Sequence, residues 1–117
     1  MHTPNPVSHL AFARASAGRS SHLGARLSSL IEPALKAPGC LQFSLQQSMH
    51  DPDMWVVSGM WSSAETMDAW FATPALNVFA EVVQQLIVSS LDFQTFKHVS
   101  SVQAKADCLP PLQQLAS

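Results

Sequence analysis

The stretch Trp55–Trp70, which reads WVVSGMWSSAETMDAW, constrains the fold of this chain more than any other part of it. Its first half alternates large and small residues around two adjacent valines, which is typical of a β-strand with apolar side chains on both faces. Its second half places Ser62 three residues before Glu65, the spacing of a capping box, so we expect a helix to begin at Ser63. A strand that runs straight into a helix and carries three tryptophans predicts an aromatic wall that any ligand would meet.

Three further segments alternate apolar and polar residues with period two, which predicts strands at Val7–Ala15, Cys40–Gln47 and Ser89–His98. We expect His9 to share one strand face with Val7 and Ala11. The second of these strands and the strand Trp55–Trp61 are joined by Asp51-Pro52-Asp53, which is turn chemistry and predicts a hairpin. The second strand is expected to face the core with Leu41, Phe43 and Leu45, and the last strand is expected to have Leu91, Phe93 and Thr95 on one face.

Two segments have apolar residues at helical spacing. The first predicts one helix over residues 20–36, capped by Ser20 or Ser21 and either kinked or loosened early at Pro33. The second begins at Ser63 and pauses at Thr73-Pro74, where proline suits a first helical position and a new helical segment can start. The buried side of this last segment is expected to comprise Leu76, Phe79, Val83, Leu86 and Ile87.

The resulting order β-α-β-β-α-β predicts an α+β, ferredoxin-like fold, in which two helices cover one face of a four-stranded antiparallel sheet. The other sheet face still carries apolar residues, including Leu10 and Phe12, so we expect a second copy to cover it and form a dimeric α+β barrel. We expect a flexible N-terminal arm at residues 1–6, one domain over 7–99, and a C-terminal tail at 100–117 that packs on the partner subunit.

The composition excludes several classes of protein. With 117 residues the chain is one domain, and its 12% charged against 47% hydrophobic residues favour a homodimer with a buried face. A net charge of −2 with six scattered basic residues argues against nucleic-acid binding. We expect no membrane span and no signal peptide, and therefore a cytoplasmic protein. Cys40 and Cys108 are expected to be free thiols, and no metal site is expected because no His or Cys spacing suits one.

The motif series Pro38-Gly39-Cys40, Trp61-Ser62-Ser63-x-Glu65 and Thr73-Pro74 resembles the antibiotic biosynthesis monooxygenase (ABM) family over roughly residues 7–99. The resemblance implies a dimeric α+β barrel with a pocket between the sheet and the helices of each subunit. The family includes cofactor-free oxygenases of polyketide quinols and anthrones, haem-degrading enzymes and an isomerase of a signalling sugar phosphate. A cofactor-free oxygenase would take a small aromatic molecule and O₂ as substrates, so the resemblance implies no cofactor.

The family's catalytic residues are matched only in part. Trp61 matches the strand-end tryptophan that the oxygenases place near substrate. Their accompanying asparagine and tyrosine correspond to Ser58 and Met67 here, and their arginine corresponds to about Ala80. The haem-degrading members resemble this chain at Trp70, but their iron-ligating histidine also falls at Ala80, which makes haem degradation the weaker alternative.

His9 is the candidate base, because a neutral imidazole in an apolar cavity can take a proton from a phenol or quinol. The alternative is a histidine that is hydrogen-bonded at the sheet margin. Trp61 and Trp70 complete the candidate catalytic set, either as walls for a planar ligand or simply as core residues. The candidate substrate-binding residues are Phe43, Ser58, Met67, Phe71, Asn77 and Phe79.

Two functions of different class therefore stay open at this point. The first is a cofactor-independent monooxygenase of an aromatic or quinol substrate, with His9 as its base. The second is a dimer of the same fold that binds a small molecule without transforming it. A pocket closed by side chains would favour the binder, and an open cavity with His9 or Ser58 in its wall would favour the enzyme.

Overall fold

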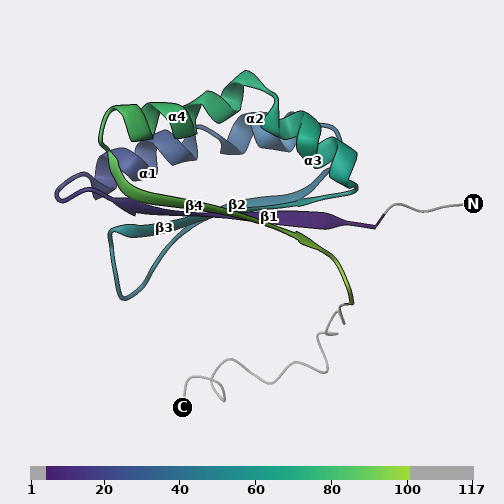
Figure 1. The fold of residues 1–117 in the computed structure, drawn as a ribbon, viewed down its shortest axis with the longest axis horizontal. Helices are drawn as coiled ribbons and strands as arrows, with labels where there is room; N and C mark the ends of the chain where they lie inside the picture. The colour runs from purple at the N-terminus through teal and green to yellow at the C-terminus, as the bar shows by residue number, and fades with distance from the viewer. Residues whose placement is uncertain (1–4, 101–117) are drawn as a thin grey trace, which may run out of the picture.

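The computed structural model describes residues 5–100, which form a four-stranded sheet with helices on one face only (Figure 1). All strand pairs are antiparallel, in the order β2-β3-β1-β4. The elements are β1 (Val7–Ala15), α1 (Ser20–Ser28), α2 (Ile31–Lys36), β2 (Cys40–Gln47), β3 (Met54–Trp61), α3 (Ala64–Phe71), the short 3-10 helix η1 (Pro74–Leu76), α4 (Asn77–Gln84) and β4 (Val88–Lys97). The predicted ferredoxin-like α+β fold is confirmed.

The central strand β1 separates the two faces of the sheet by strict alternation. His9, Ala11 and Ala13 are buried under the helices, whereas Leu10 and Phe12 face the side that no helix covers (Figure 1). The two alanines leave room above the sheet, and the fully buried Leu23 and Leu27 of α1 fill it within the same core. The sheet face that holds His9 is therefore the face that builds the core.

The face assignment predicted for β2 holds at Phe43 and fails at Leu41, which is 55% exposed. The register explains the difference, because Cys40 pairs with Trp61 and Gln42 pairs with the next residue, Met60. Leu41 is thus the extra residue of a β-bulge and is turned out of the ladder. A period-two pattern cannot show such an insertion.

The single helix predicted over residues 20–36 is wrong, because α1 ends at Ser28 and α2 starts at Ile31. Proline has no N–H to donate to the carbonyl four residues earlier, which for Pro33 is that of Ser29, and the helix is interrupted at Ser29 and Leu30. The predicted serine cap is also wrong: Arg19 occupies the cap position without a side-chain bond. The hydroxyl of Ser20 instead donates to the carbonyl of Pro52 at 2.5 Å.

The capping box that starts α3 lies one residue later than the sequence spacing predicted. The hydroxyl of Ser63 accepts from the backbone N–H of Thr66 at 3.2 Å, and the Ser63 N–H donates to the Thr66 hydroxyl at 3.3 Å. Ser62 instead uses its backbone N–H to bond the carbonyl of Gly39 at 2.8 Å. That bond ties the end of β3 to the turn before β2.

The pause at Thr73-Pro74 is confirmed, since η1 begins at Pro74 and separates α3 from α4. The buried stripe of α4 differs from the predicted one, because Phe79 and Val82 are buried while Val83 is 47% and Leu86 72% exposed. The helix ends at Gln84, and Leu86 follows it in the left-handed region with φ of 58°. Helical spacing therefore no longer applies at Leu86.

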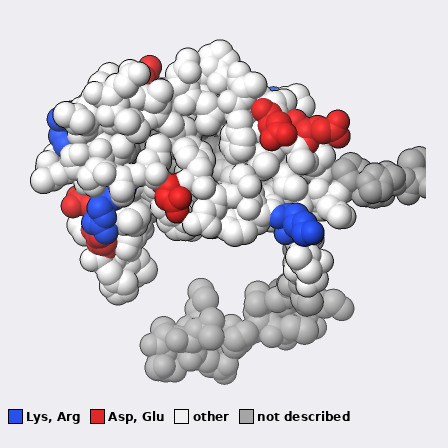
Figure 2. All heavy atoms as spheres, in the orientation of Figure 1, with Lys and Arg blue, Asp and Glu red and all other residues white. Residues whose placement is uncertain are grey.

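Several other sequence predictions concern the surface and the chain ends. Charged side chains of both signs stand at separate points on the face shown in Figure 2, with no continuous basic region there. No helix over residues 5–100 is both long and apolar enough to cross a membrane. Cys40 is a free thiol, whereas Cys108 and most of the predicted arm and tail lie outside the described residues.

Candidate functional site

The imidazole of His9 lies in the middle of an aromatic cluster between β1 and the helices, and only 2% of the residue is exposed. Its ring centre is 5.2 Å from that of Phe71, 5.9 Å from that of Phe43 and 6.3 Å from that of Trp61. The Trp61 indole is stacked on it at 24°, whereas Phe71 meets it edge-on. These contacts place a titratable group among apolar rings.

Gly59 makes this arrangement possible, because it pairs with both His9 on β1 and Phe43 on β2. A Cβ atom on Gly59 would lie 2.5 Å from His9 Nε2 and 2.9 Å from Trp61 Nε1. Any side chain there would displace one ring or the other. The missing Cβ therefore lets two polar nitrogens approach one point on the sheet.

Three ring nitrogens of the cluster are buried without a hydrogen-bond partner among the described residues: His9 Nδ1, His9 Nε2 and Trp61 Nε1. An unpaired buried polar group costs about 1–3 kcal/mol, and native cores avoid it almost everywhere else. Burial also lowers the pKa of His9 from 6.5 to about 4, because the charged imidazolium is poorly solvated there. At neutral pH the ring is therefore an uncharged donor and acceptor.

The cluster extends away from His9 in two directions. On one side Trp61 stacks on Trp70 with ring centres 5.6 Å apart, and Phe43 meets Trp70 edge-on at 5.6 Å. On the other side Phe71 contacts Phe93 of β4 at 6.5 Å, and Phe93 contacts Phe79 at 4.7 Å. Trp70 is buried, whereas Phe93 is 41% exposed.

An apolar cleft of about 210 Å³ opens outside Trp70, between α3 and the turn before β2. Two indoles stacked on each other, those of Trp70 and Trp61, separate this cleft from the imidazole of His9. A ring bound in the cleft would stack on Trp70 without reaching His9. The cleft is lined by Ala37, Pro38, Glu65, Thr66, Ala69, Trp70 and Thr73.

The structure brings most of the predicted site residues together. His9, Trp61 and Trp70 join Phe43, Phe71 and, through Phe93, Phe79 in one aromatic cluster, and Met67 is buried in the same core. Ser58 and Asn77 lie apart from the cluster. The hydroxyl of Ser58 faces the uncovered side of the sheet and is 2.7 Å from that of Ser44, and Asn77 is exposed at the start of α4.

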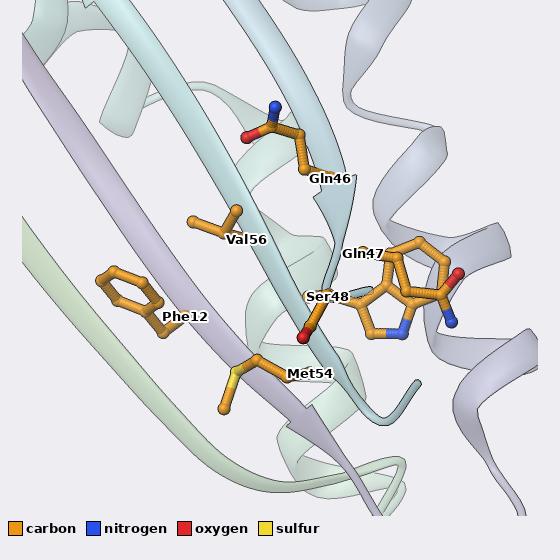
Figure 3. A pocket seen from close by; sticks show the side chains of 7 residues that line it. Phe12, Gln46, Gln47, Ser48, Met54 and Val56 are labelled. Atoms are coloured by element: carbon orange, nitrogen blue, oxygen red, sulfur yellow. The ribbon is translucent and has the colours of Figure 1, made fainter. Parts of the chain in front are cut away.

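The uncovered sheet face has hollows of its own. The larger one, of about 380 Å³, lies at the hairpin end, where Phe12, Val56 and Met54 lie on neighbouring strands beside Gln46 (Figure 3). A smaller one of about 100 Å³ lies near Ser58 and Met60. His9 also lines this second hollow, although only 2% of the residue is exposed.

Within residues 5–100, no three His, Cys, Asp or Glu side chains lie close enough together to hold a metal ion. The chemistry available in the cluster is that of a neutral imidazole, an indole N–H and stacking surfaces. Such a set can orient a planar aromatic molecule and exchange a proton with it.

The sequence of residues 6–82 matches the family model described as antibiotic biosynthesis monooxygenase, which covers more than half of the chain. The chain belongs to the ABM family. That membership confirms the resemblance that the proline, tryptophan and serine motifs indicated. Membership of a family does not by itself define the reaction.

Solved structures show that the ABM fold recurs in distant bacterial proteins. PA3566 from Pseudomonas aeruginosa is 20% identical with a TM-score of 0.76, covering 86% of this chain and 100% of that one. Rv0793 from Mycobacterium tuberculosis is 22% identical with a TM-score of 0.74, covering 84% and 99%. A Deinococcus radiodurans protein provisionally named an antibiotic biosynthesis monooxygenase is 19% identical with a TM-score of 0.75, covering 86% and 99%. At these identities the likeness shows the fold alone. No curated protein matches the sequence significantly.

Sequence reasoning missed two residues that shape the site. Gly59 was not among the candidate residues, yet a glycine inside an apolar strand signals the close approach of another group, which here is the pair of rings above it. Phe93 was expected to share one face of the last strand with Leu91 and Thr95, but not to be part of the site. Its contacts with Phe71 and Phe79 depend on tertiary packing that no local pattern encodes.

Proposed function

We propose that this ABM protein is an oxidoreductase of the monooxygenase type that acts on a small, electron-rich aromatic molecule such as a quinol or anthrone. The observation that supports it is the set of three buried, unpartnered ring nitrogens on His9 and Trp61. A substrate with a hydroxyl and a carbonyl group would give these nitrogens hydrogen bonds, and its rings would replace aromatic contacts already present in the cluster.

His9 would act as the base. Its neutral imidazole takes a proton from an activated CH₂ or hydroxyl group of the substrate, and the anion so formed stabilises the imidazolium next to it. The substrate anion then reduces O₂. For an anthrone-type CH₂, one oxygen atom ends as the new carbonyl and the other leaves as water with the two hydrogens, so the reaction balances without a further reductant. The proposed reaction requires no cofactor.

Trp61, Trp70 and Phe43 would hold the plane of the substrate, with Met67 and Phe79 behind them in the core. Trp61 is stacked on Trp70, and its indole plane is inclined by 24° to the plane of the His9 imidazole. This arrangement would favour a flat ligand over a branched one. Placing the site in a core with little water would also strengthen each hydrogen bond to the substrate.

The protein would work as a homodimer, as part of the same proposal. The sheet face without helices exposes Phe12 at 36%, Met60 at 37% and Phe96 at 44%, and Phe12 lines the 380 Å³ hollow of Figure 3. A second copy would cover these side chains, and burial of about 800 Å² per subunit is ordinary for a stable dimer. A cytoplasmic site of action stays part of this proposal.

A second candidate, a small-molecule-binding dimer without catalysis, is favoured by one observation. The rings of Phe43, Trp61 and Phe71 enclose His9 and leave it almost no exposed surface. A substrate must displace at least one of them to reach the imidazole. If that displacement is too costly, the cluster is a core and ligands bind elsewhere.

Oxygen uptake by the purified, metal-stripped protein decides between these candidates, measured against a panel of quinols and anthrones. We expect uptake by the wild type, loss of uptake in His9→Leu, and reduced uptake in Trp70→Ala. Ser58→Ala is the matched control on the other sheet face and should keep full uptake. Quenching of tryptophan fluorescence by a panel member without any oxygen uptake would instead support the binder.

A further inference from the structure

The helix-side strip of β4, formed by Phe93, Thr95 and Lys97, leads directly to His9. The register pairs Phe93 with Ala11, Thr95 with His9 and Lys97 with the residue at the start of β1, so all three lie on the same face as the imidazole. All three are nevertheless exposed. The helical layer therefore stops short of this edge of the sheet.

One side chain contacts both His9 and this strip. The ring of Phe71 contacts the imidazole at 5.2 Å on one side and the ring of Phe93 at 6.5 Å on the other. Phe71 is itself only half-buried, at the last position of α3. A rotation of this one ring would connect the strip to the unpartnered nitrogens of His9.

Lys97 gives the strip its charge. Three other basic residues form ion pairs, namely Arg14 with Asp51, Arg26 with Glu81 and Lys36 with Glu32. Lys97 forms no ion pair with any residue of the described range 5–100, and it is the basic residue on the helix side of β4. Strand spacing places its Cα about 8 Å from that of His9, the length of a two-ring aromatic system.

We propose that Phe71, Phe93, Thr95 and Lys97 form the recognition surface for a hydroxylated aromatic carboxylate. The rings of Phe71 and Phe93 would stack on the ligand, the ammonium group of Lys97 would bind its carboxylate, and its hydroxyl at the far end would reach His9. The proposal rests on the proposed function, because it takes the His9 cluster as the reacting site. It narrows the substrate from any aromatic molecule to one with an acidic group.

The cleft outside Trp70 is the alternative approach, and its chemistry suits this ligand less well. Its rim carries the carboxylate of Glu65 and no basic side chain, so it would repel an anion. The strip on β4 has the opposite charge and only one ring, that of Phe71, between it and the imidazole.

The test is equilibrium binding of two fluorescent probes, 6-hydroxy-2-naphthoate and 2-naphthol, which share the ring system and hydroxyl but differ in the carboxylate. We expect the wild type to bind the carboxylate about fivefold more tightly at low salt, as one exposed charge pair allows, and the preference to shrink at high salt. Lys97→Met should remove the preference and leave 2-naphthol binding unchanged. Lys36→Met is the matched control and should keep it.

Three outcomes would overturn the proposal: equal affinity of the wild type for both probes, equal effects of Lys97→Met and Lys36→Met, or no binding of either probe. Its failure is distinct from failure of the oxygenase. Lys97-dependent binding without oxygen uptake would keep the surface and reject the enzyme. Binding of 6-hydroxy-2-naphthoate that needs His9 but not Lys97 would keep the reacting site and reject the surface.

Discussion

The two ends of β3 each place a tryptophan against the helices, and the two indoles differ in whether their N–H group has a hydrogen-bond acceptor. At the hairpin end, Trp55 packs against Gly24 and its Nε1 donates to the Ser20 hydroxyl at 3.1 Å, while Ser20 donates to the carbonyl of Pro52. At the other end, Trp61 is fully buried and its Nε1 has no partner among the described residues.

The difference separates a region built for stability from one built for a ligand. The hairpin end gives the Trp55 indole and the Ser20 hydroxyl their hydrogen-bond partners and fills its space with aliphatic side chains such as Leu23 and Leu27. The other end leaves polar atoms unpaired among aromatic rings, an arrangement that lowers stability unless a ligand supplies the missing bonds. Strained or unsatisfied groups of this kind are typical of functional sites.

The largest effect is expected at the stable end. Leu27→Ala should lower the free energy of unfolding by about 3 kcal/mol, because the fully buried side chain leaves a cavity against the sheet. Urea denaturation measures this loss. Phe12→Ala on the uncovered face is the control and should cost less in a monomer, and a larger loss there would show that this face is covered in solution.

The next effect is a pH dependence of stability from His9. The pKa of His9 is about 4 in the folded chain and 6.5 when exposed, so between these values the unfolded chain binds a proton that the folded chain does not. The free energy of unfolding should therefore fall by about 3 kcal/mol as the pH drops from 7 to 4. Denaturation of wild type and His9→Leu across this range isolates the effect. Parallel profiles for the two proteins would contradict it.

Two glycines offer a matched pair, because a Cβ on Gly24 would lie 2.5 Å from the Trp55 ring and one on Gly59 would lie 2.5 Å from His9 Nε2. Each alanine substitution should destabilise by about 1–2 kcal/mol through displacement of a ring, the helix propensity of alanine offsetting part of this at Gly24. Only Gly59→Ala should abolish oxygen uptake or probe binding. Equal functional losses in both variants would remove the distinction between the two ends.

The smallest effects should have opposite signs. Ser20→Ala leaves the indole N–H of Trp55 without its acceptor and should destabilise by about 1 kcal/mol. His9→Leu removes two unpartnered nitrogens from an apolar site and should stabilise by about 1 kcal/mol at pH 7. Thermal unfolding of the two variants gives both signs, and a destabilised His9→Leu would mean that the imidazole is well satisfied in the folded protein.

The sequence predicted the architecture well because that depends on repeating patterns. Alternation in Val7–Ala15 placed His9 on one face with Ala11, which the structure shows to be the core side, and Thr73-Pro74 marked the interruption between α3 and α4. The predictions were wrong where a single residue interrupts the regular spacing of a strand or a helix. The extra residue Leu41 in β2 and the lost hydrogen bond at Pro33 each shift an element in a way that periodicity does not encode.

The site was predictable in its membership but not in its geometry. Trp61, Trp70 and His9 could be named from residue type and strand face, and they do lie together. Ser58 was selected because of its position in the family motif. It pairs with Leu10 rather than with His9, so strand alternation places its side chain on the opposite sheet face from the imidazole. Whether the ring nitrogens of His9 and Trp61 find hydrogen-bond partners depends on distances between the strands and the helices. Those distances cannot be calculated from a single sequence.

The bulge at Leu41 has a consequence for how the protein avoids polymerising. Strand β2 is one of the two outer strands of the sheet, and a regular outer strand offers a free ladder of N–H and C=O groups to any extended chain. The bulge bends and twists that ladder near its start, so a foreign strand cannot stay in register along its length. A single irregular residue thereby protects an apolar chain with few charges from adding further strands at this edge.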